Sequence, residues 1–454
     1  MSATTPTWRT NLYAIVPHRS EPRILLLPGD GGWSLPCAHI DQRIWAPQVD
    51  RVSRALRDTL GIDYVVLRSV YVTVDHEMKQ QMDAVYALEQ RFSAWTPPAG
   101  ARWVGLETLS DLPLAMPEQR RALLPYLHEQ AGGPISPLRP PWARPGWFAA
   151  AESWTSAQLE RLGYALVAPI EQIKNWGISC ILRARTTAGD VYFKVAAPLP
   201  LFANEPLLME SLAAAHPDFI PAPLAIEHEQ RWMLLADVGP ELRDNRAEAD
   251  WTTALRLYAR IQRSFVGETE ALLAMGCLDR SLDRLAAQID EVLEDTAALE
   301  RLSAAELTQI RSLAPRLRSM CGELAGYGVP QTLVHGDLHG GNIALRDERY
   351  LFFDWTDGCV AHPFLDVVTM MDEVAASLDA QACLRLRDAY LSLWTGYAPL
   401  EGLQAAWTIA APLGALHQAV SYYHIVKQLE PSAKPELAWG VSYWLQQMLR
   451  SMPA

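Results

Sequence analysis

Two short runs of this sequence combine the residue types that phosphoryl transfer requires: HGDLHGGN at 335–342 and FDW at 353–355. A carboxylate can accept the proton of an attacking hydroxyl, and amide and carboxylate oxygens can hold Mg²⁺ against nucleotide phosphates. We therefore interpret Asp337 as the base and Asn342 and Asp354 as metal ligands. The alternative is a polar turn whose side chains cap backbone groups, but a turn requires neither the distant aspartate nor its spacing.

The residues that flank the first run predict two strands. Residues 331–334 read QTLV and residues 350–353 read YLFF, and both runs are apolar-rich, which is typical of short buried strands. A polar turn, RDER at 346–349, lies between them. We expect these strands to bracket the loop that carries the candidate residues.

Together the two runs resemble the catalytic segment of the aminoglycoside phosphotransferase and choline kinase family, which are small-molecule kinases with a protein-kinase-like fold. In that family His-Gly-Asp stands where protein kinases have His-Arg-Asp, as it does at 335–337 here. The resemblance implies ATP and Mg²⁺ as cofactors and a hydroxyl group of a small molecule as the acceptor. GTP in place of ATP stays open, because no side chain decides between the two nucleotides.

The resemblance also implies residues that support the loop. His335 would pack under the metal-binding strand and donate to the backbone. Asp366, in the run HPFLD, would hydrogen-bond the loop from the start of a helix, a role that is compatible with capping that helix. For His339 two roles stay open, contact with phosphate and bracing of the loop.

Upstream of this site the sequence predicts the elements of a kinase N-lobe. After a helix at Ser153–Tyr164, alternating apolar residues and a hairpin turn at 188–190 indicate strands Val167–Lys174, Ile178–Thr186 and Val191–Val195, then a helix Glu205–Ala215 and a strand Arg231–Leu235.

Lys194 ends the third of these strands, the position from which a kinase-type lysine reaches the α and β phosphates. Glu205 is the expected ion-pair partner, with Glu210 on the same helix as the alternative. A solvated strand-end lysine is the other interpretation. The turn between the first two strands, with Gly177 and Ser179, would cover the nucleotide although it carries a single glycine, and an ordinary hairpin is equally consistent with it.

The next segment resembles the hinge between kinase lobes, where backbone groups bind adenine; it includes Leu235 and Asp237. Farther along, only a short connection separates Asp354 from Asp366, and it leaves no room for the peptide-binding platform of protein kinases. We therefore expect a small-molecule acceptor, enclosed by the helical region from Asp366 to Met452.

A segment rich in proline and glycine divides the chain. Residues 131–146 read AGGPISPLRPPWARPG, which predicts a linker, and its Trp142 indicates packing on a neighbouring surface. We expect an α+β protein with four parts: a Nudix-like domain at 1–130, a linker at 131–147, a β-rich N-lobe at 148–240 and a mainly helical C-lobe at 241–454.

The N-terminal part predicts strands Leu12–Val16, Ile24–Leu27 and Val65–Val74 and a helix Gln48–Leu60. This order resembles a Nudix hydrolase domain of α/β/α type, whose helix carries three metal-binding glutamates. Ala55 and Thr59 occupy two of those positions, so Asp58 is the only carboxylate of the three. One carboxylate cannot readily gather the ligands of Mg²⁺ at a diphosphate, so we expect the fold without the hydrolysis. An unrelated α+β domain is the alternative.

Composition narrows the classes of function. The formal net charge of −13 disfavours nucleic acid and anionic membranes as partners, and six scattered cysteines without a Cys-x-x-Cys pair predict buried free thiols. No run approaches the roughly 18 apolar residues of a membrane span, and no signal-peptide pattern is present, so we expect a cytoplasmic protein of unknown oligomeric state. Two further functions stay open, a nucleotide-binding pseudokinase sensor and a Nudix-type hydrolase with an accessory kinase-like domain.

Overall fold

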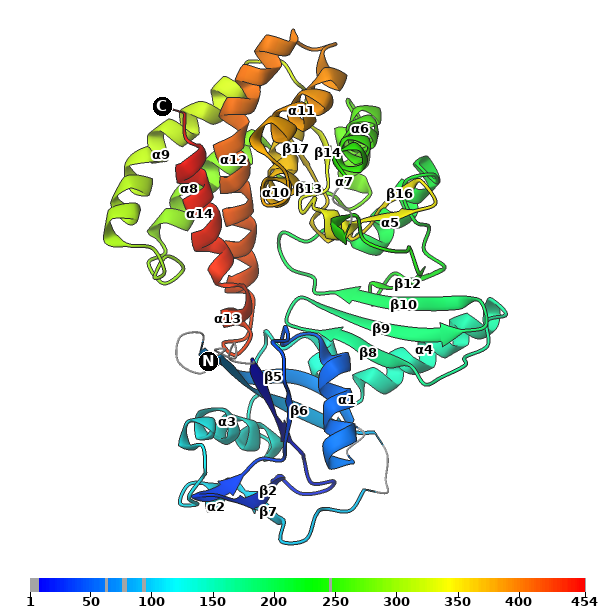
Figure 1. Cartoon of the computed structure of the whole chain (residues 1–454), viewed down its shortest axis with the longest axis vertical. Helices are drawn as coiled ribbons and strands as arrows, with labels where there is room; N and C mark the ends of the chain where they lie inside the picture. The colour runs from blue at the N-terminus through cyan, green and yellow to red at the C-terminus, as the bar shows by residue number, and fades with distance from the viewer. Residues whose placement is uncertain (1–7, 62–63, 76–79, 92–94, 245–246, 454) are drawn as a thin grey trace, which may run out of the picture. The chain divides into compact units, whose positions relative to one another are not determined.

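The computed structural model describes residues 8–61, 64–75, 80–91, 95–244 and 247–453. They form two compact units, one of residues 1–197 with 429–434 and the other of residues 198–428 with 435–454. Sheets and helices occur in both units, so the predicted α+β class is confirmed (Figure 1). The four-part division of the chain stays a prediction.

The first unit begins with a four-stranded sheet of order β4-β1-β6-β5, which comprises β1 (Arg9–Ile15), β4 (Cys37–Ile40), β5 (Tyr64–Asp75) and β6 (Gln81–Gln90). β1 and β6 are parallel, and the other pairs are antiparallel. Helix α1 (Val49–Leu60) buries Val49, Val52 and Leu56 on one side of this sheet. Burial of each such side chain contributes about 1.5–3 kcal/mol.

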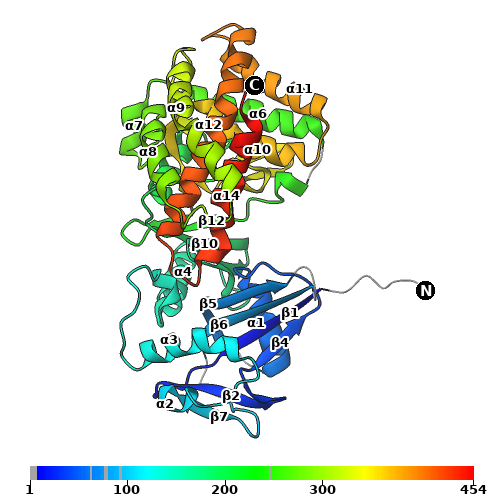
Figure 2. The same ribbon diagram turned by 90° about the vertical axis from the view of Figure 1, so that its left-hand side faces the viewer.

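The opposite face of that sheet is also covered. Leu12 and Ala14 share an apolar cluster with α1, whereas Tyr13 and Ile15 share another with Leu123. Leu123 belongs to helix α3 (Arg120–Gln130), and a small sheet adds β2 (Arg23–Gly29), β3 (Gly32–Ser34) and β7 (Arg102–Gly105) (Figure 2). Burial on both faces explains why 12–16 is a continuous apolar run. The sequence analysis missed β6 and β7.

The remainder of the first unit is a three-stranded antiparallel meander. It consists of β8 (Glu171–Asn175), β9 (Ser179–Thr186) and β10 (Gly189–Ala196). Helix α4 spans Trp147–Arg161, so the predicted start at Ser153 was wrong. The helix follows Gly146, whose φ of 86° ends the preceding segment, and it buries Phe148 and Ala151, which both precede the predicted start. A short 3₁₀ turn, Pro141–Ala143, buries Trp142.

The second unit is mainly helical. It opens with α5 (Glu205–Ala215) and the hairpin of β11 (Ala225–Glu227) and β12 (Trp232–Ala236). One large apolar core then unites the longer helices, which are α6 (Glu248–Ser264), α8 (Leu282–Glu294), α9 (Ala304–Ala325), α10 (Pro363–Ala375), α11 (Ala380–Leu391), α12 (Leu400–Lys427) and α14 (Trp439–Ser451). Among the described residues, no helix combines the length and the apolar character needed to cross a membrane.

Two small sheets in this unit flank the candidate loop. One has the order β13 (Leu278–Asp279), β17 (Cys359–Ala361), β14 (Thr332–Val334), and the other pairs β15 (Ile343–Arg346) with β16 (Arg349–Phe352). The predicted strands at 331–334 and 350–353 therefore exist, each shifted by one residue or less at its ends. β15 was missed, and the polar turn at 346–349 joins it to β16.

Candidate active site

The candidate loop runs from the end of β14 to a 3₁₀ turn at Gly340–Asn342, and buried hydrogen bonds hold its backbone. Asp366, on the first turn of α10, is fully buried and accepts from the amides of His335 and Gly336, each at 2.8 Å. The Tyr258 hydroxyl donates to the same carboxylate. Burial raises the pKa of Asp366 to about 7, and the two amide bonds oppose that shift. The cap of α10 is His362, whose Nδ1 accepts from Phe364, so Asp366 serves the loop.

Gly336 allows the chain to turn before Asp337. Its φ is 83°, a left-handed conformation that side-chain-bearing residues rarely adopt, and a Cβ there would collide with the Asp357 carbonyl oxygen. On the other side, Gln418 of α12 donates from Nε2 to the Gly336 carbonyl at 2.7 Å. The backbone next to the candidate base is therefore held from both sides. The sequence analysis missed Gln418, because its partner lies far away in the sequence.

His335 links the loop to the residue before Asp354. Its ring is fully buried and tilted against Trp355 at a centroid distance of 4.6 Å, and Nε2 lies 2.9 Å from the Phe353 carbonyl. Burial lowers the pKa of His335. A neutral ring with its proton on Nε2 donates to Phe353, which is the arrangement that the resemblance implied.

His339 contacts the candidate base. Its Nε2 lies 3.4 Å from Asp337 Oδ2, while its Nδ1 lies 3.0 Å from the Gly341 amide and 2.7 Å from an Arg243 nitrogen. Burial opposes ionisation of Asp337, but the hydrogen bond and charge of His339 outweigh it, so the pKa of Asp337 is lowered. The same contact raises the pKa of His339 against the effect of burial. These contacts are compatible with bracing of the loop, and the choice between the two open roles of His339 stays a prediction.

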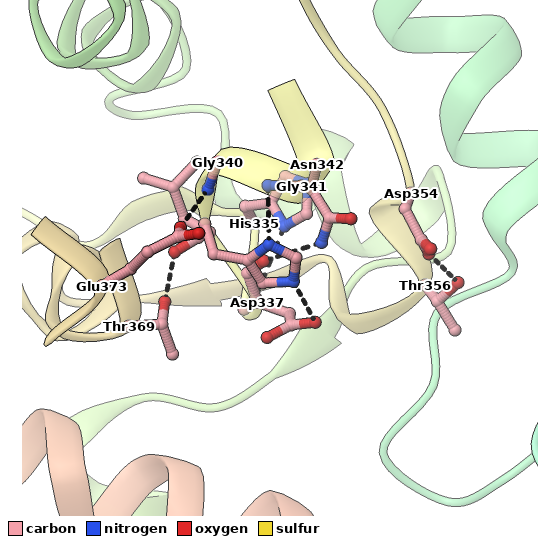
Figure 3. A network of polar contacts seen from close by, with 12 residues as sticks. His335, Asp337, Gly340, Gly341, Asn342, Asp354, Thr356, Thr369 and Glu373 are labelled. Atoms are coloured by element: carbon pink, nitrogen blue, oxygen red, sulfur yellow. Dashed lines mark hydrogen bonds and ion pairs between the residues drawn. The ribbon is translucent and has the colours of Figure 1, made fainter. Parts of the chain in front are cut away.

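Glu373 and Thr369 of α10 hold the far side of the loop. The Gly340 amide donates to Glu373 Oε2 at 2.6 Å, and the Thr369 hydroxyl donates to the Leu338 carbonyl (Figure 3). Thr369 is also buried. The loop is thus anchored to α10 at both ends.

The two candidate metal ligands are held by different contacts. Asn342 is buried and donates from Nδ2 to the Asp337 carbonyl at 2.9 Å, which makes its amide oxygen the atom suited to a cation. Asp354 adopts a left-handed conformation, φ 62°, at the end of β16, and its Oδ1 accepts from the Thr356 hydroxyl at 2.8 Å. Such a conformation costs roughly 1–2 kcal/mol for a residue other than glycine. It is the kind of local strain found at functional sites.

Thr356 connects Asp354 to Glu205. Its hydroxyl lies 3.0 Å from Glu205 Oε2, and Glu205 is 2% exposed at the first position of α5. Glu210 is instead exposed and lies 3.8 Å from His228, so of the two candidate glutamates only Glu205 reaches this site. The sequence analysis missed Thr356, because its role depends on a contact between residues 151 positions apart.

The remaining predicted site residues are distributed over both units. Lys194 is buried on β10, and Gly177 and Ser179 lie in the β8–β9 turn, all in the first unit. The Lys194–Glu205 ion pair stays a prediction. In the second unit, Leu235 is buried in the core on β12, and the Asp237 carboxylate forms an ion pair with Arg346 at 2.6 Å.

The donor set fits Mg²⁺ arriving with a nucleotide. Among the residues that the structure describes, no group of three or more His, Cys, Asp or Glu side chains could hold a metal ion alone. Mg²⁺ prefers oxygen ligands, keeps several waters and takes one or two carboxylates together with substrate phosphates. The Asp354 carboxylate and the Asn342 amide oxygen are ligands of this kind.

Solved structures of several small-molecule kinases are similar to this chain. A choline/ethanolamine kinase family protein from Mesorhizobium loti is 17% identical with a TM-score of 0.45, and the match covers 66% of this chain and 98% of that one. A choline kinase from Streptococcus pneumoniae is 13% identical with a TM-score of 0.46, covering 66% and 99%. A macrolide 2'-phosphotransferase from Brachybacterium faecium is 19% identical with a TM-score of 0.41, covering 64% and 98%.

These sequence identities and TM-scores do not indicate a function for this chain. No curated protein matches the sequence. The model of the phosphotransferase enzyme family does match it, over residues 183–403, a range that contains the candidate loop, Asp354 and Asp366. This match confirms the predicted family resemblance over residues 183–403, which are similar to phosphotransferase enzymes.

Proposed function

We propose that the protein transfers the γ-phosphate of ATP to a hydroxyl group of a small molecule, with an aminoglycoside-, choline- or sugar-like acceptor. The observation that carries the proposal is the contact of His339 with Asp337 on a loop anchored by Asp366. This contact keeps the candidate base ionised, and the Asp337 side chain is 42% exposed, so a substrate hydroxyl can reach it.

In this mechanism Asp337 accepts the proton of the acceptor hydroxyl as the oxygen attacks the γ-phosphorus. Asn342 and Asp354 would hold Mg²⁺, which supplies neutralisation of charge on the phosphate oxygens. Thr356 positions the Asp354 carboxylate through its 2.8 Å hydrogen bond. His335 and Asp366 hold the loop beside the segment that precedes Asp354.

Residues 148–240 and 241–454 would be the N-lobe and C-lobe of a protein-kinase-like domain. In that arrangement Lys194, oriented by Glu205, binds the α and β phosphates, and the turn with Gly177 and Ser179 covers the nucleotide. Backbone groups near Leu235 and Asp237 would bind the base. We propose ATP as the nucleotide and leave GTP as an outcome of the test. Residues 1–130 would be a Nudix-like domain, and the cytoplasmic location stays a prediction.

The test is incubation of the full chain with Mg²⁺, γ-labelled ATP and, in separate reactions, aminoglycosides, choline, ethanolamine and sugars. We expect label in the small-molecule fraction with at least one acceptor, and no transfer by Asp337→Asn. Parallel reactions with labelled GTP settle the nucleotide. Label that accumulates mainly in protein bands from a cell extract would overturn the small-molecule acceptor.

A further inference from the structure

The turn at 175–179 is held on several sides by residues from outside the β8–β10 meander. Asn175 is 4% exposed, and its side-chain Nδ2 donates to the carbonyls of Val66 at 2.6 Å and Leu67 at 3.2 Å, both on β5. Its backbone amide donates to the Pro47 carbonyl at 2.9 Å. All of these partners lie in the part of the chain before the proline-rich segment.

The next residue of the turn, Trp176, is held in the same way. Its carbonyl accepts from Nε1 of the buried Trp142 at 2.7 Å. Its ring meets Trp45 edge to face at 4.8 Å, and the Lys174 ammonium lies over the rings of both tryptophans. The turn is therefore fixed through backbone and side chain together.

β5 offers these bonds because of its place in the sheet. It is an edge strand, and its register with β6 shifts between Val66 and Arg68, so Leu67 is an extra residue in the pairing. Edge strands and bulges leave backbone groups without a strand partner. Gln172 lies on β8 before the turn and bonds the same strand, accepting from the Val66 amide at 2.8 Å and donating to its carbonyl at 3.0 Å.

Residues 429–434, which belong to the same unit, also pack against the turn. A Cβ on Gly177 would lie 2.7 Å from Leu429 Cδ2 and 3.3 Å from the Ala433 side chain, so this position has no room for a side chain. Glu430 is held by Arg139 at 2.6 Å, and Arg139 also binds Glu129 of α3 at 2.8 Å. Arg139 and Glu430 are both buried, so removal of either partner would leave a buried charge without that counter-ion.

We propose that the N-terminal domain and the linker position the nucleotide-covering turn, the domain through its bonds to Asn175 and the linker through the bond of Trp142 to Trp176. This inference rests on the proposed function, which assigns residues 175–179 to the nucleotide. Ordering a turn costs conformational entropy, and a turn that is already ordered lowers the entropy that nucleotide binding must overcome. The domain thus has a role that needs no catalytic carboxylate of its own.

The test compares three variants of the full chain, each of which removes a contact between the β8–β9 segment and either the N-terminal domain or the linker. Asn175→Ala and Trp142→Phe release the turn, and Trp142→Phe keeps the aromatic packing while removing one donor. Gln172→Ala is the matched control, because it also bonds Val66 but lies before the turn. The measurements are calorimetric titration with a non-hydrolysable Mg·ATP analogue and a thermal unfolding midpoint for each protein.

We expect Asn175→Ala and Trp142→Phe to bind the analogue about five- to tenfold more weakly, the factor that one or two lost hydrogen bonds represent. Gln172→Ala should lower the unfolding midpoint about as much as the other two variants do. Its dissociation constant for the analogue should equal that of the wild type. Equal analogue affinity in all four proteins, or an equal loss in all three variants, would overturn the positioning role. A wild-type chain that binds no analogue would instead overturn the proposed function, and this inference with it.

Discussion

The catalytic loop and helix α1 resemble motifs of two enzyme families, but they differ in what they retain. In the loop, Asp337, Asn342 and Asp354 are all present, and buried contacts from α10, α12 and α5 hold them in place. In α1 the helix forms and buries Val52 and Leu56, yet Ala55 and Thr59 stand where the resemblance requires carboxylates. A formed element therefore does not imply an activity, and only the side chains at the site distinguish the two cases.

The largest expected effect is the loss of activity when the candidate base of the loop is replaced. Asp337→Asn should reduce kcat by roughly 10²- to 10⁴-fold, because it removes the general base. The dissociation constant of a non-hydrolysable Mg·ATP analogue should stay nearly unchanged, since the base acts on the acceptor. Steady-state kinetics and calorimetry together check this, and unchanged turnover would refute the assignment.

Asp354→Ala should act on nucleotide binding itself. Loss of a direct metal ligand costs several kcal/mol, so we expect binding of Mg·ATP analogue to weaken by about 100-fold. Titration in the presence and absence of Mg²⁺ provides the control, because the variant should lose most of the Mg²⁺-dependent part. Equal Mg²⁺ dependence in both proteins would mean that Asp354 does not hold the ion.

Thr356→Val sharpens the comparison by removing one hydroxyl without a change in size. The variant loses the hydrogen bonds to Asp354 and Glu205, and we expect about fivefold weaker binding of the Mg·ATP analogue, the effect of roughly 1 kcal/mol. Thr356→Ser retains the hydroxyl and is the matched control. Identical behaviour of the two variants would exclude a role for the hydroxyl.

The contact between Asp337 and His339 predicts the pH dependence. His339 lowers the pKa of Asp337, so the base stays ionised to lower pH than an isolated buried carboxylate would. Replacing His339 with Gln should raise that pKa and move the acidic limb of kcat/KM to higher pH. A profile of kcat/KM against pH for both proteins checks the sign, and an unmoved acidic limb would contradict it.

For α1 we expect no hydrolytic activity. The full chain should show no Mg²⁺-dependent hydrolysis of nucleoside diphosphate compounds, because one carboxylate, Asp58, cannot gather the ligands. Asp337→Asn in the same assay removes any contribution of the loop. Hydrolysis that survives in Asp337→Asn and disappears in Asp58→Ala would show that α1 retains chemistry.

Local signals predicted some elements well. The helix at Glu205–Ala215 was predicted with the bounds that the structure shows, because its apolar residues and flanking segments mark both ends. β15 was missed, because four residues directly after a glycine-rich turn are too short for a periodic pattern. β6 was missed because it is buried on both faces from Ala84 to Leu88, which removes the alternation that marks a strand.

The roles of the candidate site residues stay predictions, and the contacts that support the site could be inferred only in part. Asp337, Asn342 and Asp354 follow from residue type and spacing within one segment. Gln418 and Thr356 could not be inferred, because their partners lie 82 and 151 positions away in the sequence and only the folded chain brings them together.

The most direct measurement of the central claim is mass spectrometry of the acceptor after reaction with Mg·ATP, alongside ADP formation. We predict that ADP forms only when a particular hydroxylated small molecule is present, and that this molecule is recovered with one added phosphate. Asp337→Asn should yield neither product. Formation of ADP without any acceptor, or a phosphorylated acceptor in equal amount from Asp337→Asn, would contradict the account.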